Sequence, residues 1–303
     1  MRNNVAAVLR TSKFNFHFPW VREILRTLPP SIGARFTPPG IRDMIRFRMA
    51  IRQEVNTILN MPTGVKGNEG QQSVFYELKD NPSLPESEKS AQRLEDEATL
   101  LVMAGTESTA KSLTMAHYAI LANPKIMKRL RAELRSRPSA SLAELEKLPY
   151  LNGIIQEAHR LTFGLTGRNA RVCPDQTLKY TDKSSGKTYT FPPGTPLSAS
   201  SLLVHTNEIL FPDPWTFEPE RWIGPDSVAR RKSMLSFGRG PRICIGMHLA
   251  NAEMCMAVAA MARWDMELFQ TSDLDVTFLH DYHVAAAKLN SKGVCVKVLQ
   301  QVA

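Results

Sequence analysis

Apolar residues recur every three or four positions along most of this 303-residue chain, which is the spacing of helices that bury one face. The spacing predicts helices over residues 42–59, 87–122, 125–135, 142–147, 151–162 and 198–205, and a further one directly after residue 246. The longest begins near Ser87 and ends before Asn123-Pro124, so it would extend about 50 Å at 1.5 Å per residue. The fold should therefore be mainly helical.

Stretches of alternating apolar and polar residues predict a minor β region. Residues 169–190 read as strands joined by a hairpin turn over 183–187, and residues 276–279 and 294–298 read as a terminal strand pair. The fold class expected is mainly α with a minor β region. We expect a single domain over residues 1–303, although the length also allows two smaller ones.

A glycine interrupts the longest predicted helix. Gly105 is followed by the hydroxyl residues Thr106, Ser108 and Thr109. Glycine inside a helix costs about 1 kcal/mol relative to alanine. This stretch predicts either a local opening of the helix where a ligand sits or a plain packing glycine.

Positive charge is concentrated near the start of the chain. The net charge is +9, and the first 60 residues hold ten Lys or Arg against Glu23, Asp43 and Glu54. Large apolar residues are interleaved with these charges: Phe14, Phe16, Phe18, Trp20 and Leu25. Such a mixture suits the headgroup layer of a membrane better than nucleic acid. A solvated basic face with a few core aromatics is the alternative.

The cysteines limit the classes of protein. Cys173, Cys244, Cys255 and Cys295 are widely spaced and form no C-x-x-C pair. This pattern argues against a disulfide framework or a zinc site and favours a reducing compartment. No apolar run approaches the roughly 20 residues that span a bilayer, and the N-terminus lacks the compact apolar stretch of a secretory signal.

One cysteine, Cys244, lies in a glycine-rich turn directly before a predicted helix. We expect Gly240 and Gly246 to take positive φ angles and to let the backbone approach a bulky partner closely. The helix N-terminus, Arg239 and Arg242 should favour a thiolate over a thiol. A thiolate on a shaped loop suits an axial ligand to haem iron.

The pattern Phe237-x-x-Gly240-x-Arg242-x-Cys244-x-Gly246 resembles the haem-binding signature of the cytochrome P450 family at its five fixed positions. The resemblance implies heme b with Cys244 as the iron ligand. It also implies that Arg242 pairs with a haem propionate and that Phe237 packs beside the sulfur. Gly246 completes the signature. Residues 237–264 are then the haem-thiolate loop and its helix.

A second motif is Glu157-x-x-Arg160, in which three-residue spacing places both side chains on one helical face. On the residues alone such a pair is usually a surface ion pair of little consequence. In the family it joins an arginine from a Pro-Glu-Arg segment, here Arg221, in a buried structural triad. Arg171 corresponds to a second propionate contact, and the neighbouring Arg168 competes with it.

The family carries an acid–alcohol pair in a long helix over the distal face of the haem. By resemblance, residues 87–122 form that helix, Glu107 is the acid and Ser108 is the alcohol. The family usually has threonine at the second position, so the sequence departs from it. Serine keeps the hydroxyl but loses the methyl group that restricts its rotamer. Thr109 is the alternative for the proton-relay role.

Taken over the whole chain, the resemblance implies the cytochrome P450 fold without its N-terminal part, with residues 1–60 as a basic substrate-entrance region. It implies a monooxygenase that inserts one oxygen atom from O₂ into a small lipophilic substrate such as a terpenoid, in fungal secondary metabolism. The implied partners are NADPH-cytochrome P450 reductase and a membrane surface, at the cytoplasmic face of the endoplasmic reticulum. The alternative is a non-catalytic haem-binding or membrane-associated remnant.

A basic run precedes the cysteine loop. Arg230, Arg231 and Lys232 could steer an acidic flavin domain of the reductase toward the thiolate side of the haem. An exposed charge run without such a role is the alternative.

Overall fold

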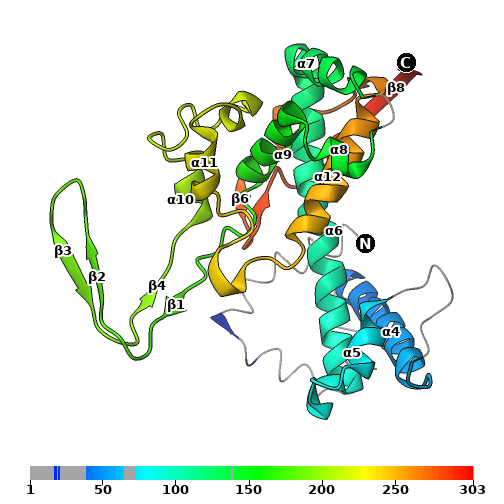
Figure 1. Cartoon of the computed structure of the whole chain (residues 1–303). Helices are drawn as coiled ribbons and strands as arrows, with labels where there is room; N and C mark the ends of the chain where they lie inside the picture. Colours follow the sequence, from blue (N-terminus) through cyan, green and yellow to red (C-terminus); the bar gives the residue numbers. More distant parts are fainter. Residues whose placement is uncertain (1–16, 19, 21–38, 65–72, 138–139, 303) are drawn as a thin grey trace. The chain divides into compact units, whose positions relative to one another are not determined.

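The computed structural model describes residues 17–18, 20, 39–64, 73–137 and 140–302 (Figure 1). The chain divides into two compact units, Met1–Ala110 and Lys111–Ala303, and each is described by itself. The expected single domain stays a prediction. Of the aromatic residues near the N-terminus, Phe18 and Trp20 are described, and both are exposed with their rings in edge-to-face contact. Phe14, Phe16 and Leu25 lie outside the described residues.

The first unit is built from helices. Its elements are α4 (Pro39–Leu59), α5 (Val74–Asp80), a 3₁₀ turn (Glu86–Lys89) and the first part of α6 (Ala91–Ala122). A small core of Val55, Leu94 and Ala98 holds them together, because the apolar sides of α4 and α6 meet there. Arg48 on α4 pairs with Glu95 on α6 at 3.1 Å. Both helices confirm the predicted segments, with starts displaced by a few residues.

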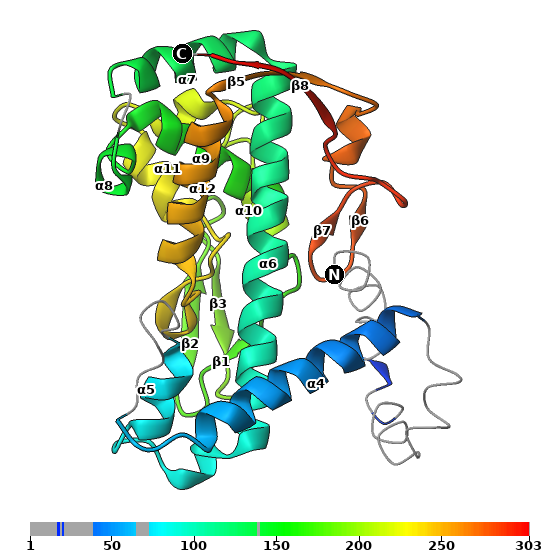
Figure 2. The ribbon, with the colours of Figure 1, turned by 90° about the vertical axis from the view of Figure 1, so that its right-hand side faces the viewer.

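Helix α6 runs without a break through Gly105 (Figure 2), so the predicted opening is wrong. The hydroxyls of Thr106 and Ser108 donate to the carbonyls of Val102 and Ala104, each at 2.7 Å, and so follow the helical course. A Cβ at Gly105 would meet no atom of the described residues within 4 Å. The packing interpretation of this glycine therefore gains no support either.

A single apolar core organises the second unit. The helices around it are α7 (Pro124–Arg135), α8 (Leu142–Leu145), α9 (Pro149–Thr162) and α12 (Met247–Met261). Ile154 and Ala158 on α9, Leu130 on α7 and Met254 and Val258 on α12 are completely buried in this core. Contact between α9 and α12 sets the cysteine loop against the Glu157 helix.

Short elements connect α9 to α12. They are α10 (Ser201–His205), a 3₁₀ turn (Pro219–Trp222), α11 (Ser227–Ser233) and a 3₁₀ turn within the cysteine loop (Gly240–Arg242). Helix α11 was not predicted, because its charge run Arg230-Arg231-Lys232 hides any apolar face. Strands β1 (Arg171–Val172) to β4 (Pro196–Leu197) also lie in this part of the chain.

In the part of the chain that the structure describes, every sheet is an antiparallel pair of strands. The pairs are β1 (Arg171–Val172) with β4 (Pro196–Leu197), β2 (Leu178–Thr181) with β3 (Thr188–Phe191), β5 (Trp264–Leu268) with β8 (Val296–Gln301), and β6 (His280–Asp281) with β7 (Ala285–Ala286). The hairpin of β2 and β3 confirms the predicted turn. The terminal strand does form, but its partner is β5 and not residues 276–279, so that pairing was wrong. A mainly helical fold with a minor β region is confirmed.

The four cysteines are free thiols. Cys255 lies in the core, where burial raises the pKa of its thiol to about 11. Cys244 is the exposed one. Within the described residues, no helix combines the length and apolar character needed to cross a membrane.

Candidate functional site

The cysteine loop has a defined backbone. The Cys244 amide donates to the Phe237 carbonyl at 2.9 Å and closes the loop. Gly240 has φ +76°, as expected, whereas Gly246 has φ −86°, so its predicted positive φ is wrong. A Cβ at Gly246 would lie 3.9 Å from the Cys244 sulfur. Helix α12 begins at Met247, three residues past the thiol, which places Cys244 before a helix N-terminus.

Large apolar residues close to Cys244 in the sequence are exposed, as the thiol is. Ile243, Ile245 and Leu249 are 47%, 91% and 63% exposed, and Arg242 is exposed as well. Arg239 instead turns back to the Met234 and Arg231 carbonyls, so its guanidinium holds the loop. An accessible sulfur among open aliphatic side chains, with a cation nearby, fits a large apolar group that carries an acidic edge and takes an axial thiolate. Haem has these properties.

Glu157, Arg160 and Arg221 meet in one buried network. Glu157 Oε1 accepts from Arg160 Nη2 at 2.8 Å and from Arg221 Nε at 3.0 Å. Its Oε2 accepts from Arg160 Nε at 2.8 Å and from Trp222 Nε1 at 2.9 Å. The Glu218 amide also donates to Oε1, at 3.0 Å. The ionic side chains are at most 3% exposed. The three residues that the motifs single out are thus in direct contact.

The remaining arginine donors bind backbone carbonyls, and Arg221 Nη2 also pairs with the Glu218 carboxylate at 3.1 Å. Arg160 Nη1 donates to the His205 carbonyl at 2.8 Å, and Arg221 donates to the carbonyls of Pro212 and Asp213. Buried charges are tolerated when their hydrogen-bonding groups are paired in this way. The network therefore ties α9 to the irregular segment that leads to the cysteine loop.

Two buried histidines near this network carried no signal in the sequence analysis. His159 lies between Glu157 and Arg160 on α9, and His205 ends α10. Burial lowers the pKa of each ring to about 4, because the charged imidazolium loses its hydration. Both rings are therefore neutral near pH 7. Lone histidines have no distinctive spacing, so their contacts were visible only in three dimensions.

The acid–alcohol residues lie in the first unit. Glu107 is half-buried, Ser108 is exposed and Thr109 is buried. The Ser108 hydroxyl donates to the Ala104 carbonyl. Ser108 is thus accessible, whereas Thr109 is buried. The exposure favours Ser108 over Thr109 as the relay, and the role itself stays a prediction.

The propionate-binding arginines differ in how they are held. Arg242 is exposed at the end of the 3₁₀ turn in the cysteine loop. Arg171 is exposed in β1, and the hydrogen bonds found for it among the described residues go to the nearby carbonyls of Asn169 and Ala170, at 3.4 Å and 3.2 Å. Arg168 is also exposed. The choice between Arg171 and Arg168 stays open.

The basic run on α11 is partly structural. Arg230 donates to the Arg221 carbonyl at 3.0 Å, and Arg231 donates to the Trp222 carbonyl at 2.9 Å. For Lys232 no hydrogen bond is found within the described residues. Of these three residues, Lys232 is therefore the one whose substitution tests steering of the reductase without breaking a hydrogen bond of the described structure.

We expect Lys232→Glu to lower the rate of reduction by the flavin partner and to weaken the salt dependence of that rate, because it reverses an exposed charge. Stopped-flow reduction at several salt concentrations measures both quantities. Lys183→Glu, in the hairpin turn after β2, is the matched control. Equal rates for the two variants would support an exposed charge run without a steering role.

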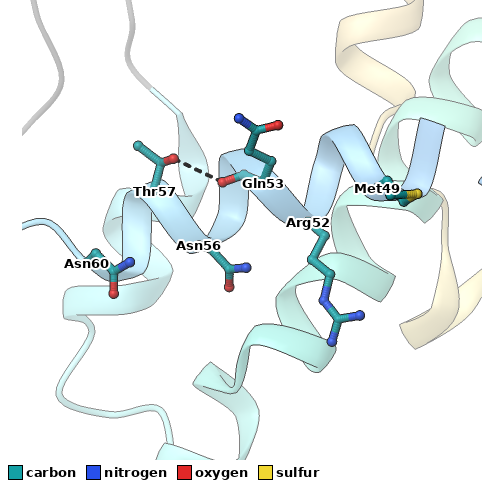
Figure 3. Close-up of a pocket in the computed structure, with 6 residues that line it drawn as sticks. All are labelled: Met49, Arg52, Gln53, Asn56, Thr57 and Asn60. Atoms are coloured by element: carbon teal, nitrogen blue, oxygen red, sulfur yellow. Dashed lines mark hydrogen bonds between the residues drawn. The ribbon is translucent and has the colours of Figure 1, made fainter. Parts of the chain in front are cut away.

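A pocket opens along α4 and is lined by Met49, Arg52, Gln53, Asn56, Thr57 and Asn60 (Figure 3). Its lining comes from one helix. Gln53 and Thr57 lie on one side of the ribbon and Arg52 and Asn56 on the other (Figure 3). Ligand sites usually bring a few polar groups to one point. We assign no ligand to this pocket.

Comparison with known proteins identifies the family that the chain matches. It matches the cytochrome P450 family over residues 42–277. It is 35% identical to the cytochrome P450 monooxygenase tpcC of Cochliobolus heterostrophus, over 93% of this chain and 56% of that protein. It is 34% identical to the monooxygenase TRI4 of Trichoderma arundinaceum, over 92% of this chain and 54% of the relative. The conidiogenone synthase PchP450 of Penicillium rubens is 34% identical, over 97% and 58% of the two chains.

The fold also has a solved counterpart. The structure of retinoic acid bound cyanobacterial CYP120A1 superposes with a TM-score of 0.67 and 23% identity, over 93% of this chain and 63% of the other. The chain spans about half the length of the curated relatives it matches. The family match and the relatives together show that this chain belongs to the cytochrome P450 family.

Proposed function

We propose that the chain acts as a haem-thiolate monooxygenase of fungal secondary metabolism, with a small lipophilic substrate such as a terpenoid. The observation that carries the proposal is Cys244, an exposed thiol on a closed loop that bears all five positions of the family signature. The family implies haem with a cysteine thiolate ligand. The relatives named as monooxygenases support the reaction class.

In this proposal the protein positions groups around the cofactor. Cys244 supplies the thiolate, Phe237 packs beside the sulfur, and Arg242 with Arg171 or Arg168 pairs with the propionates. When bound, haem supplies the centre that activates O₂ for transfer of one oxygen atom, with electrons from NADPH through a reductase. The exposed apolar side chains of Ile243, Ile245 and Leu249 would pack on an apolar cofactor, and that contact would keep water from the sulfur.

Proton delivery is assigned to α6. Ser108 holds its proton toward the Ala104 carbonyl, and rotation about χ1 would free the hydroxyl to pass that proton on. Glu107, one residue earlier and half-buried, is the acid that would restore it. Contact with a membrane surface at the endoplasmic reticulum is part of the same proposal, supported by the basic and aromatic composition of residues 1–60.

The test is to purify the chain, supply haem and record the spectrum of the reduced carbon monoxide complex. A red-shifted Soret band is expected, since thiolate ligation produces it. Reductase, NADPH and candidate terpenoids then test turnover. A Soret band without the red shift would reject thiolate ligation, and haem uptake without any product would favour the non-catalytic alternative.

A separate prediction concerns Ser108. Ser108→Ala should lower product formed per NADPH consumed by roughly 10²-fold, with peroxide released instead, because a positioned proton relay contributes about this much. Ser108→Thr should remain coupled. Thr106→Ala is the matched control, since its hydroxyl makes the same bond to the carbonyl four residues earlier. Unchanged coupling in Ser108→Ala would move the relay to Thr109.

A further inference from the structure

The segment directly before the cysteine loop, residues 235–237, is held by two histidines. His205 Nε2 accepts a hydrogen bond from the Leu235 amide at 2.9 Å. On its other side, His205 Nδ1 lies 3.0 Å from the Arg160 carbonyl. An amide can only donate and a carbonyl can only accept, so the proton of this ring is on Nδ1. Both ring nitrogens are therefore committed to backbone groups.

His159 holds the next two residues. Its carbonyl accepts from the Ser236 hydroxyl at 2.7 Å, and its ring meets the Phe237 ring edge-to-face with centroids 4.8 Å apart. The Ser112 hydroxyl lies 3.1 Å from His159 Nδ1, so a hydrogen bond there fixes the orientation of the ring. His159 is 4% exposed and His205 is fully buried.

Phe237 links these contacts to Cys244. Phe237, whose ring packs on His159, offers the carbonyl that accepts the Cys244 amide. The backbones at Gly164, just past α9, and Ser236 lie very close together, because a Cβ at Gly164 would be 2.1 Å from the Ser236 carbonyl oxygen. Residues 235–237 therefore have little room to shift unless α9 or α10 shifts with them.

The same contacts reach the Glu157 network. Arg160 donates through Nη1 to the His205 carbonyl, while the Arg160 carbonyl accepts from the His205 ring. His205 is thus bonded to Arg160 in both directions and to the cysteine loop through Leu235. We propose that His159 and His205 are positioning residues that transmit the rigidity of the Glu157 network to the Cys244 sulfur.

Side-chain chemistry supports this role over simple filling of the core. A buried imidazole costs more to desolvate than a leucine of similar size, and His205 offsets that cost only through its two backbone bonds. Burial keeps the pKa of both rings near 4, so the lone pair of His205 Nε2 stays available to the Leu235 amide. An apolar residue could fill either volume but could not accept that bond.

The inference rests on the proposed function only where the sulfur binds haem, so the experiment has one arm without haem. The full chain is compared with His205→Phe, His159→Leu and His205→Gln by hydrogen exchange of single amides. Loss of the acceptor in His205→Phe should speed exchange at Leu235 and Cys244 by about tenfold, the equivalent of one net hydrogen bond. His159→Leu should speed exchange at Cys244. His205→Gln, which keeps a donor and an acceptor, should restore much of the protection.

The matched control is His117→Leu. His117 also lies on a helix, its Nε2 is buried with no hydrogen bond found within the described residues, and burial lowers its pKa. It should leave exchange at both loop amides unchanged. Unaltered exchange at Cys244 in both His205→Phe and His159→Leu would overturn the proposal. If His205→Phe does not fold, unaltered exchange at Cys244 in His159→Leu overturns the proposal.

The second arm uses the haem-loaded protein. His205→Phe and His159→Leu should lose the red-shifted Soret band of the reduced carbon monoxide complex about tenfold faster than the parent chain, with His117→Leu unchanged. Equal loss rates in all variants would overturn the link to the sulfur. A parent chain without the red-shifted band would reject the proposed function, and the exchange arm would still show whether the histidines position the loop.

Discussion

Replacing Glu157 with glutamine should destabilise the unit of residues 111–303 by about 3–5 kcal/mol, the cost of removing one member of a buried ion pair. Every group that contacts the Glu157 carboxylate is a donor, from Arg160, Arg221, Trp222 and the Glu218 amide. The amide nitrogen of glutamine would face those donors. Arg160 would then stay buried without the ion pair that the structure gives it, and Arg221 would keep its pair with the Glu218 carboxylate at 3.1 Å.

The fluorescence of Trp222, a member of the Glu157 network, can be used to follow its unfolding. Trp222 is 1% exposed and donates to Glu157, whereas Trp20, Trp215 and Trp264 are 59%, 59% and 40% exposed. The red shift of buried tryptophan emission during urea unfolding therefore follows the environment of Glu157. The midpoint should fall sharply while the dependence on urea stays the same.

The control is Glu267→Gln. Glu267 pairs with Lys297 at 3.3 Å across β5 and β8, with both side chains more than half exposed. Because exposed pairs contribute little, this change should alter stability by less than about 1 kcal/mol. Similar losses for Glu157→Gln and Glu267→Gln would mean that burial gives the Glu157 network no special weight.

Much of the candidate site could be predicted because its residues have fixed spacing. The three-residue step from Glu157 to Arg160 dictates a shared helical face. Arg221 was expected from the family resemblance, and the structure places its Nε 3.0 Å from Glu157 Oε1. Helix ends could also be predicted from the sequence, since Asn123 caps α7 and Pro124 occupies its first turn. These features depend on local geometry, which sequence records directly.

Features that depend on distant partners were less accessible. The terminal strand β8 pairs with β5, and nothing local in residues 294–298 distinguishes this partner from residues 276–279. Gly105 suggested a broken helix, but the neighbouring hydroxyls bond back to helix carbonyls and leave α6 continuous. The roles of His159 and His205 come entirely from neighbours more than 25 residues away or from backbone groups.

Cys244→Ala should have the opposite profile to Glu157→Gln, with loss of haem ligation and little change in stability. The Cys244 side chain is exposed, so its truncation should change the free energy of unfolding by no more than about 0.5 kcal/mol. Without the sulfur, the reduced carbon monoxide complex should lack the red-shifted Soret band and product formation should cease, because no other group replaces the thiolate. Cys173→Ala, at a half-buried free thiol, controls for cysteine removal and should keep the band. A red-shifted band in Cys244→Ala would assign the iron ligand to another thiol. A large loss of stability would show that the Cys244 side chain packs against the loop and is not exposed.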